Sequence, residues 1–164
     1  MTGNRQPPML SEQIRSTPAV RALEDREAGV VTEAKLYRDQ LSIQVAPEQI
    51  VSICRFLKQE QSYTRLSFIT AVDWFPVEPR FEVVYSLHSL ERNHWLRVKC
   101  RVGGENPEID SVTGVWRSAN WYEREVFDLF GIRFRNHPDL GRIMMPDDWQ
   151  GHPLRKDYPV SGAS

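Results

Sequence analysis

Three segments rich in β-branched and aromatic residues constrain the fold of this chain most strongly. They run from Leu66 to Val72, from Arg80 to Leu87 and from Trp95 to Val102, with proline and asparagine between them. Residues of this kind favour extended backbone, and turns this short connect neighbouring antiparallel strands. The segments therefore predict a three-stranded meander.

The third segment also has two chemically different faces. From Val98 onward, apolar residues alternate with basic ones, which are Arg97, Lys99 and Arg101. Consecutive side chains of a strand point to opposite sides of the sheet, so the basic residues share one face. That face is either solvated, as is ordinary for an antiparallel sheet, or it receives an acidic partner.

Before the meander, the sequence predicts a helix, a pair of strands and a second helix. The first helix covers Ala19 to Ala28, and the strands cover Val30 to Tyr37 and Leu41 to Val45. The second helix begins at Pro47, and its apolar residues recur at helical spacing. The predicted fold is α+β, with two helices layered on a mixed sheet of about five strands and an irregular C-terminal extension.

The length of 164 residues fits one domain with terminal segments. We expect a flexible arm over residues 1–16, an α+β domain over residues 17–136 and an extended, partner-binding tail over residues 137–164. The net charge of −1 gives no indication of nucleic-acid binding. No apolar run reaches the roughly 18 residues typical of a membrane span, and no secretory signal is visible, so we expect a cytoplasmic location.

The two cysteines, Cys54 and Cys100, lie far apart in apolar segments. Zinc and iron–sulfur sites generally need four ligands, so this pair cannot form one alone. We expect both to be reduced core residues, with a disulfide as the alternative.

A further helix is predicted from Trp121 to Phe130, with Asn120 as its cap and Gly131 at its end. Glu123 falls inside the apolar face of this helix. A carboxylate there must cap the helix, pair with a cation or be protonated, because an unpaired buried charge costs too much free energy.

For pairing, the expected cations are Arg142 and Arg155, which follow in the tail. The tail from His137 to Pro159 has too many prolines for regular structure and too many large apolar residues for a free linker. It is therefore expected to be ordered by a partner rather than by its own domain, with Trp149 as the anchor and with Arg155 and Lys156 at the rim.

Two His-Pro pairs in the tail suggest a metal site at first sight. They are His137-Pro138 and His152-Pro153, and Asp139, Asp147 and Asp148 lie nearby. The spacing of helical metal ligands is absent, so we interpret both histidines as polar contacts.

The region from Val112 to Pro159 resembles the 30 kDa subunit family of respiratory complex I, a subunit usually designated C. The matching residues are Glu123-Arg124-Glu125, Asp128-Leu129-Phe130-Gly131, His137-Pro138-Asp139-Leu140, Arg142-Ile143 and Leu154-Arg155-Lys156-Asp157-Tyr158. Gly141 departs from the pattern, where a basic residue or proline is expected, and this puts one local contact in doubt.

The resemblance implies a structural subunit in the peripheral arm of proton-translocating NADH:quinone oxidoreductase. That complex passes electrons from NADH through FMN and iron–sulfur clusters to quinone, but this subunit is expected to hold no cofactor. One implied partner, bound tightly, is the large subunit of the quinone-reducing module, usually designated D. Neighbouring cluster-bearing subunits are the others, and the implied location is the cytoplasmic side of the bacterial inner membrane.

No catalytic, cofactor-binding or metal residue is expected, and no nucleotide-binding glycine motif or C-x-x-C pair occurs. The resemblance implies structural and interface roles for Glu123, Arg124, Glu125, Asp128, His137, Arg142, Trp149, Arg155, Lys156 and Tyr158.

Two alternatives remain. One is the corresponding subunit of a membrane-bound nickel–iron hydrogenase. The other is a small hydrolase that uses His137 or His152 with Asp139 or Asp157, but no serine or cysteine is placed as its nucleophile.

Overall fold

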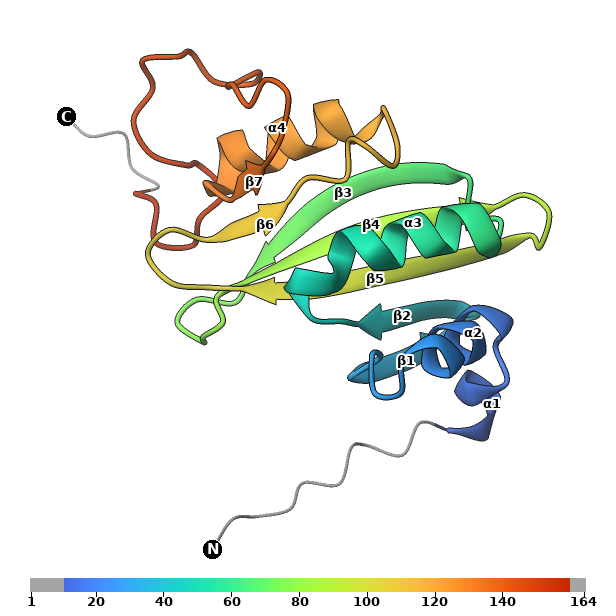
Figure 1. The fold of residues 1–164 in the computed structure, drawn as a ribbon. Helices are drawn as coiled ribbons and strands as arrows, with labels where there is room; N and C mark the ends of the chain where they lie inside the picture. The colour runs from blue at the N-terminus through green and yellow to red at the C-terminus, as the bar shows by residue number, and fades with distance from the viewer. Residues whose placement is uncertain (1–10, 160–164) are drawn as a thin grey trace, which may run out of the picture.

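The structure is a computed structural model and describes residues 11–159. The elements, in chain order, are α1 (Glu12–Arg15), α2 (Pro18–Arg26), β1 (Glu33–Tyr37), β2 (Gln40–Gln44), the 3-10 helix η1 (Pro47–Gln49), α3 (Ile50–Glu60), β3 (Arg65–Asp73), β4 (Phe81–Ser89), β5 (His94–Val102), β6 (Glu108–Asp110), α4 (Ala119–Phe130) and β7 (Arg133–Arg135). Figure 1 shows their arrangement in space.

A five-stranded sheet in the order β1-β2-β5-β4-β3 forms the centre of the fold. The strands β3, β4 and β5 form the antiparallel meander that the sequence predicted, and β1 and β2 form a hairpin. The hairpin joins the meander through a parallel pairing of β2 with β5, so the sheet is mixed. The predicted α+β fold with a mixed five-stranded sheet is confirmed.

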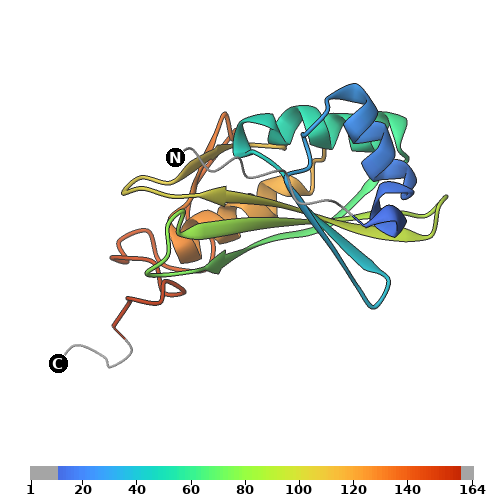
Figure 2. The ribbon, with the colours of Figure 1, turned by 90° about the horizontal axis from the view of Figure 1, so that it is seen from below.

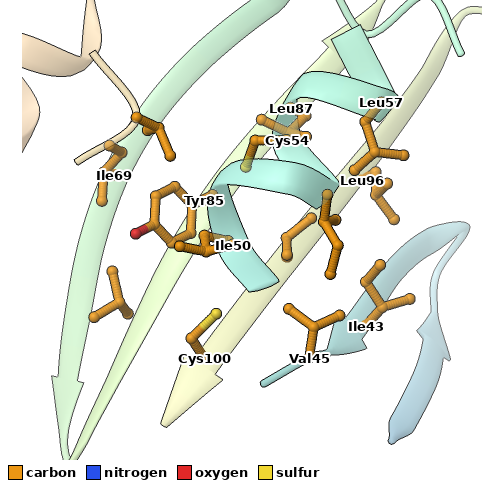
Figure 3. Packing of buried hydrophobic residues seen from close by; sticks show 14 of the residues in the cluster. Ile43, Val45, Ile50, Cys54, Leu57, Ile69, Tyr85, Leu87, Leu96 and Cys100 are labelled. Carbon is orange, nitrogen blue, oxygen red and sulfur yellow. The ribbon is translucent and has the colours of Figure 1, made fainter. Parts of the chain in front are cut away.

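Helix α3 packs on one face of this sheet and builds the core. Its residues Ile50, Cys54 and Leu57 face inward, toward β4 and β5 residues that include Tyr85 and Leu96 (Figure 3). All five side chains are at most 1% exposed to solvent. Burial of apolar side chains at this density is the main stabilising contribution to a domain of this size.

Helix α4 lies against β3 on the same face as α3. The ring of Phe130 meets the ring of Phe81 edge to face, with centroids 6.3 Å apart. The opposite face of the sheet carries no helix from the described part of the chain. Figure 2 shows α2 and α3 on one side, whereas the β1–β2 hairpin reaches beyond the other side.

Several local predictions need correction. Helix α2 ends at Arg26, before the predicted end at Ala28, because the carboxylate of Glu24 accepts the amides of Gly29 and Val31 at 2.8 and 3.0 Å. In a longer helix these two amides would donate to backbone carbonyls, and here they donate to the Glu24 carboxylate instead. Strand β1 consequently begins at Glu33 instead of Val30.

The N-terminal segment also differs from the predicted arm. Residues 1–10 lie outside the described residues, but the last part of the predicted arm contains α1, whose Ile14 is buried. A second, two-stranded parallel sheet formed by β6 and β7 was not predicted. Each of its strands has three residues, too few for an alternating pattern to stand out in the sequence.

Both thiols, Cys54 and Cys100, are free and fully buried, and burial raises the pKa of each. Because the thiolate is the reactive form, neither should react with iodoacetamide at pH 8 while the chain is folded. We expect both to be alkylated in denaturant, which mass spectrometry measures directly. Rapid labelling of the folded chain would contradict this packing.

Candidate functional site

The carboxylate of Asp128, on α4, fastens the start of the tail to the domain. Its Oδ2 accepts three consecutive amides, from Ile143 at 3.1 Å, Met144 at 2.7 Å and Met145 at 2.9 Å. The guanidinium of Arg142 lies 3.5 Å from Oδ1. Burial alone would raise the pKa of Asp128, but the amides and Arg142 outweigh it and lower the pKa. The side chain is a buried, charged anchor.

A second set of contacts closes the C-terminal end of α4. The last carbonyls of a helix have no partner within it and need donors from elsewhere. Here the carbonyl of Asp128 accepts from His152 Nδ1 at 2.8 Å, that of Leu129 from the amide of Leu154 at 3.0 Å, and that of Phe130 from Arg155 Nε at 2.6 Å. The tail therefore caps the helix.

Gly131 makes this capping possible. Its φ of +78° is left-handed, and its amide donates to the carbonyl of Phe127 at 2.8 Å. A Cβ at this position would lie 2.5 Å from the Arg155 guanidinium and 2.6 Å from the His152 ring. Glycine was predicted here as a helix stop, which is confirmed, but its close approach to the tail was not foreseen.

A third contact holds the end of the tail against the β3–β4 connection. Arg80 Nη2 lies 2.8 Å from Asp73 Oδ2 and 2.6 Å from Asp157 Oδ1, so it links the sheet to the tail. The amide of Lys156 also donates to Asp73 at 2.8 Å. Burial acts to raise the pKa of Asp73, but these partners outweigh it and lower the pKa to about 2.

Glu123 does not pair with either predicted arginine. Its carboxylate is fully buried and accepts from Ser111 Oγ at 2.6 Å and from the amide of Val112 at 2.7 Å, in the loop between β6 and α4. Glu123 lies more than one helical turn before Asp128, so it faces this loop, whereas Arg142 and Arg155 serve the other end of α4. Burial outweighs both hydrogen bonds and raises the pKa of Glu123 to about 7.

His137 approaches Glu123 without forming an ion pair with it. The Nε2 atom is 4.0 Å from the carboxylate, but it lies 3.2 Å from the carbonyl of Asn120. Nδ1 accepts the amide of Asp139 at 3.0 Å, which assigns the neutral tautomer with its proton on Nε2. Asn120 itself lies inside α4 and does not cap it, contrary to the prediction.

The remaining predicted residues also make hydrogen bonds within the chain. Arg124 Nε donates to the carbonyl of Gly141 at 3.2 Å. Gly141 takes part through its backbone carbonyl, so its departure from the family pattern does not remove this hydrogen bond. Trp149 Nε1 donates to the Tyr158 hydroxyl at 3.2 Å, while Glu125 accepts from an indole of its own helix.

Between its anchors, the tail leaves large apolar side chains in solvent. Met144 is 56% exposed, Trp149 44% and Leu154 52%. These three side chains define the exposed strip, which is the candidate interface.

The domain holds the backbone of Met144, through Asp128, and that of Leu154, through the carbonyl of Leu129. The prediction that a partner, and not the chain's own domain, orders the tail is therefore wrong at these anchors. Asp73 and Arg80, which hold the end of the tail, lie too far away in sequence for any local pattern to show their role.

Within residues 11–159, no three potential metal ligands converge. None of the helices in that range is long and apolar enough to span a bilayer.

The anchoring role of Asp128 is tested by Asp128→Asn. This change removes the charge that three amides share and brings an amide group toward them, so we expect a loss of about 3 kcal/mol in urea unfolding. Trypsin should cleave after Arg142 at least about tenfold faster, because the tail detaches. Asp148→Asn, in an exposed part of the tail, should change neither quantity; equal effects would refute the anchor.

Glu123 should make stability depend on pH. Its folded pKa of about 7 lies above the ordinary value of 4.5, so the folded chain retains a proton that the unfolded chain has lost. This proton stabilises the folded chain fully below pH 4.5, the ordinary pKa. The stabilisation disappears as the pH rises to the folded pKa of about 7, and the free energy of unfolding then falls by about 3 kcal/mol. Urea unfolding of Glu123→Gln should lack this loss, whereas Glu125→Gln should keep it; identical pH profiles would contradict the assignment.

The chain matches a known protein family over most of its length. The sequence profile described as "Respiratory-chain NADH dehydrogenase, 30 Kd subunit" matches residues 43–164. The C subunit of NADH-quinone oxidoreductase from Geotalea uraniireducens is 47% identical over 153 residues, which cover 93% of each chain. Its counterpart from Geobacter sulfurreducens, which has the same name, is 49% identical over 145 residues, or 88% of this chain and 90% of the other.

Two solved structures share the fold. A trypsin-resistant fragment of Nqo5 aligns with a TM-score of 0.65 and 33% identity, covering 73% of this chain and 97% of the fragment. A chain of the membrane-bound sulfane sulfur reductase, an archaeal respiratory membrane complex, aligns with a TM-score of 0.75 and 29% identity, covering 86% of this chain and 84% of the other. Fold, profile and identity over nearly the whole length agree that this chain belongs to the 30 kDa subunit family of respiratory complex I, the NADH-quinone oxidoreductase.

Proposed function

We propose that this chain is a cofactor-free structural subunit in the peripheral arm of proton-translocating NADH:quinone oxidoreductase. Its tail binds the large subunit of the quinone-reducing module tightly and also contacts neighbouring cluster-bearing subunits. The observation that carries the proposal is the exposed strip of Met144, Trp149 and Leu154, on a backbone that the domain already holds at Met144 and Leu154.

The physical argument rests on the entropy of binding. A free tail would lose conformational freedom when it bound a partner, and this loss would weaken the complex. The anchors at Asp128 and Arg80 have already removed much of that freedom. Large apolar side chains on an ordered backbone are typical of interface hot spots. The strip is thus suited to tight and permanent assembly.

The contacts of the buried charged side chains support a non-catalytic role. Asp128, Asp73 and Arg80 are all engaged in contacts within the chain, so none is available to act on a substrate. Glu123 has a raised pKa, as many catalytic acids do, but it is fully buried and faces a loop of its own domain. We assign it to packing and hydrogen bonding.

Electron transfer from NADH through FMN and iron–sulfur clusters to quinone then belongs to the other subunits. The complex would place this chain at the cytoplasmic side of the bacterial inner membrane, attached through protein contacts. Its contribution is to hold the electron-carrying subunits at working distance.

A second candidate is the corresponding subunit of another membrane-bound complex, such as a nickel–iron hydrogenase. The likeness to a chain of the archaeal sulfane sulfur reductase complex, at a TM-score of 0.75, favours keeping it. The identities of 47% and 49% to the two bacterial relatives favour NADH-quinone oxidoreductase. Mass spectrometry of the complex isolated through a tag on this chain separates the two, because only the first contains an NADH-oxidising flavoprotein.

Trp149→Ala tests the interface. Removing a central aromatic side chain typically costs about 2 kcal/mol or more, so the retained amount of the large quinone-module subunit should fall at least about tenfold. Lys156→Ala removes a side chain at the predicted rim and should cost well under 1 kcal/mol, roughly what exposed charges contribute. The measurement is quantitative mass spectrometry of the tagged complex after a salt wash.

Trp149 also bonds Tyr158 within the tail, so Tyr158→Phe serves as a control for the loss of that hydrogen bond alone. If Trp149→Ala and Lys156→Ala retain equal amounts of the large quinone-module subunit, the exposed strip is not the interface.

A further inference from the structure

The sheet face opposite α3 and α4 forms a second surface, separate from the tail. Strand register places Ser42, Arg97, Ser86 and Phe68 in one row across this face. The next row contains Gln44, Lys99, Val84 and Thr70. Central residues such as Val84 and Ser86 are buried although no helix of the described chain covers them, because their neighbours shield them.

Two hollows shape this face. One, of about 480 Å³, lies between the β1–β2 hairpin and the sheet, and Lys35, Lys99 and Arg101 line it together with Glu33 and Glu82. The other, of about 170 Å³, is lined by polar and aromatic side chains that include Phe68, Ser86, Trp95 and Arg97. The projecting hairpin seen in Figure 2 bounds the face on one side.

The charge on this face is unbalanced. Glu33 lies 3.4 Å from Lys35, and Glu82 lies 3.9 Å from Lys99, so both carboxylates have partners. Arg101 donates to the carbonyl of Pro79 and lies over the ring of Trp74, with no carboxylate partner among the described residues.

Arg97 likewise has no ion pair within residues 11–159. It therefore contributes, with Arg101, an excess of positive charge on this face, although the whole chain has a net charge of −1.

A buried polar atom near Arg97 also lacks a partner. His88 is 7% exposed, and its ring stacks on Trp95 with centroids 4.1 Å apart. Its Nδ1 has no hydrogen bond to any described residue. Trp95, which lies on the row next to Arg97, is 43% exposed. A half-exposed indole beside a free guanidinium is typical of a protein interface.

We infer that this open face binds an acidic segment of a partner protein, with one carboxylate side chain in the hollow beside Arg97. The inference rests on the proposed function, because the partner is another protein of the same complex. Arginine is suited to this role since its planar guanidinium can hold a carboxylate through two parallel hydrogen bonds. The ring of Trp95 then covers the apolar part of the inserted side chain.

A protein segment fits better than a lipid surface or nucleic acid. The β1–β2 hairpin projects beyond the sheet on the side of the open face and would keep a flat bilayer away from strands β3, β4 and β5. Nucleic-acid sites carry many unpaired basic residues, whereas this face has three, Arg65, Arg97 and Arg101, among charges that are otherwise paired. A few carboxylates on an extended segment match that number.

The test uses the full complex, isolated through a tag on this chain, with a photoreactive benzoylphenylalanine in place of Thr70, which is exposed on the open face. The control has the same group in place of Arg55, exposed on α3. Light should join the first variant to a net acidic segment of another protein in the complex, and the second should not yield that product. A cross-link to a lipid, to nucleic acid, to a second copy of this chain or to a segment without excess carboxylates would overturn the inference.

A charge change gives an independent readout. Arg97→Glu should lower the retention of this chain in the complex about tenfold at moderate salt, because like charges would then face each other. Arg97→Gln, which cannot repel a carboxylate, should lower it about threefold, with thermal unfolding confirming that both variants fold. Arg55→Glu is the matched control and should have no effect.

The outcomes separate this inference from the proposed function. Equal retention of the Arg97→Glu and Arg55→Glu variants, together with loss of the large quinone-module subunit in Trp149→Ala, would overturn the open-face interface alone. If no other protein of complex I copurifies with the unaltered chain, both proposals fail.

Discussion

A buried negative charge on helix α4 determines how the C-terminal third of this chain folds. Transferring a carboxylate from water into a protein interior costs several kcal/mol unless hydrogen bonds replace its hydration. Asp128 obtains those bonds from three consecutive amides of the tail, and the tail in return closes the carbonyl end of α4. Neither the helix end nor the tail is satisfied without the other, so the two form as one unit.

The sequence predicts the elements of this fold better than the contacts between them. Runs of β-branched and aromatic residues identify the strands of the meander, and helical spacing identifies α3 and α4, because both signals are local. The ion pairs of Arg80 join residues 73 and 157, and no local pattern connects positions that far apart. Glu123 was correctly predicted to be buried, but its partners were wrong, since helical periodicity gives the face of a helix and not what lies across from it.

The same distinction applies to the candidate site. The tail's prolines and apolar residues indicate an interface, and the exposure of Trp149 is consistent with one. They do not indicate that the domain itself holds the tail, because that depends on one carboxylate and a left-handed Gly131. The result is a rigid support with an apolar strip on one side and an open sheet face on another. The proposed role in positioning other subunits rests on these two surfaces.

Hydrogen exchange on the isolated chain and on the assembled complex tests the central claim, that the domain fixes the tail's backbone and a partner covers its side chains. The amides of Ile143, Met144, Met145 and Leu154 should exchange slowly in both states, since each donates within the chain. The amides of Asp147, Asp148, Gln150 and Gly151, which have no acceptor among the described residues, should gain protection only in the complex. Fast exchange of Ile143 to Met145 in the isolated chain, with protection gained on assembly, would contradict the account by showing that the partner orders the tail.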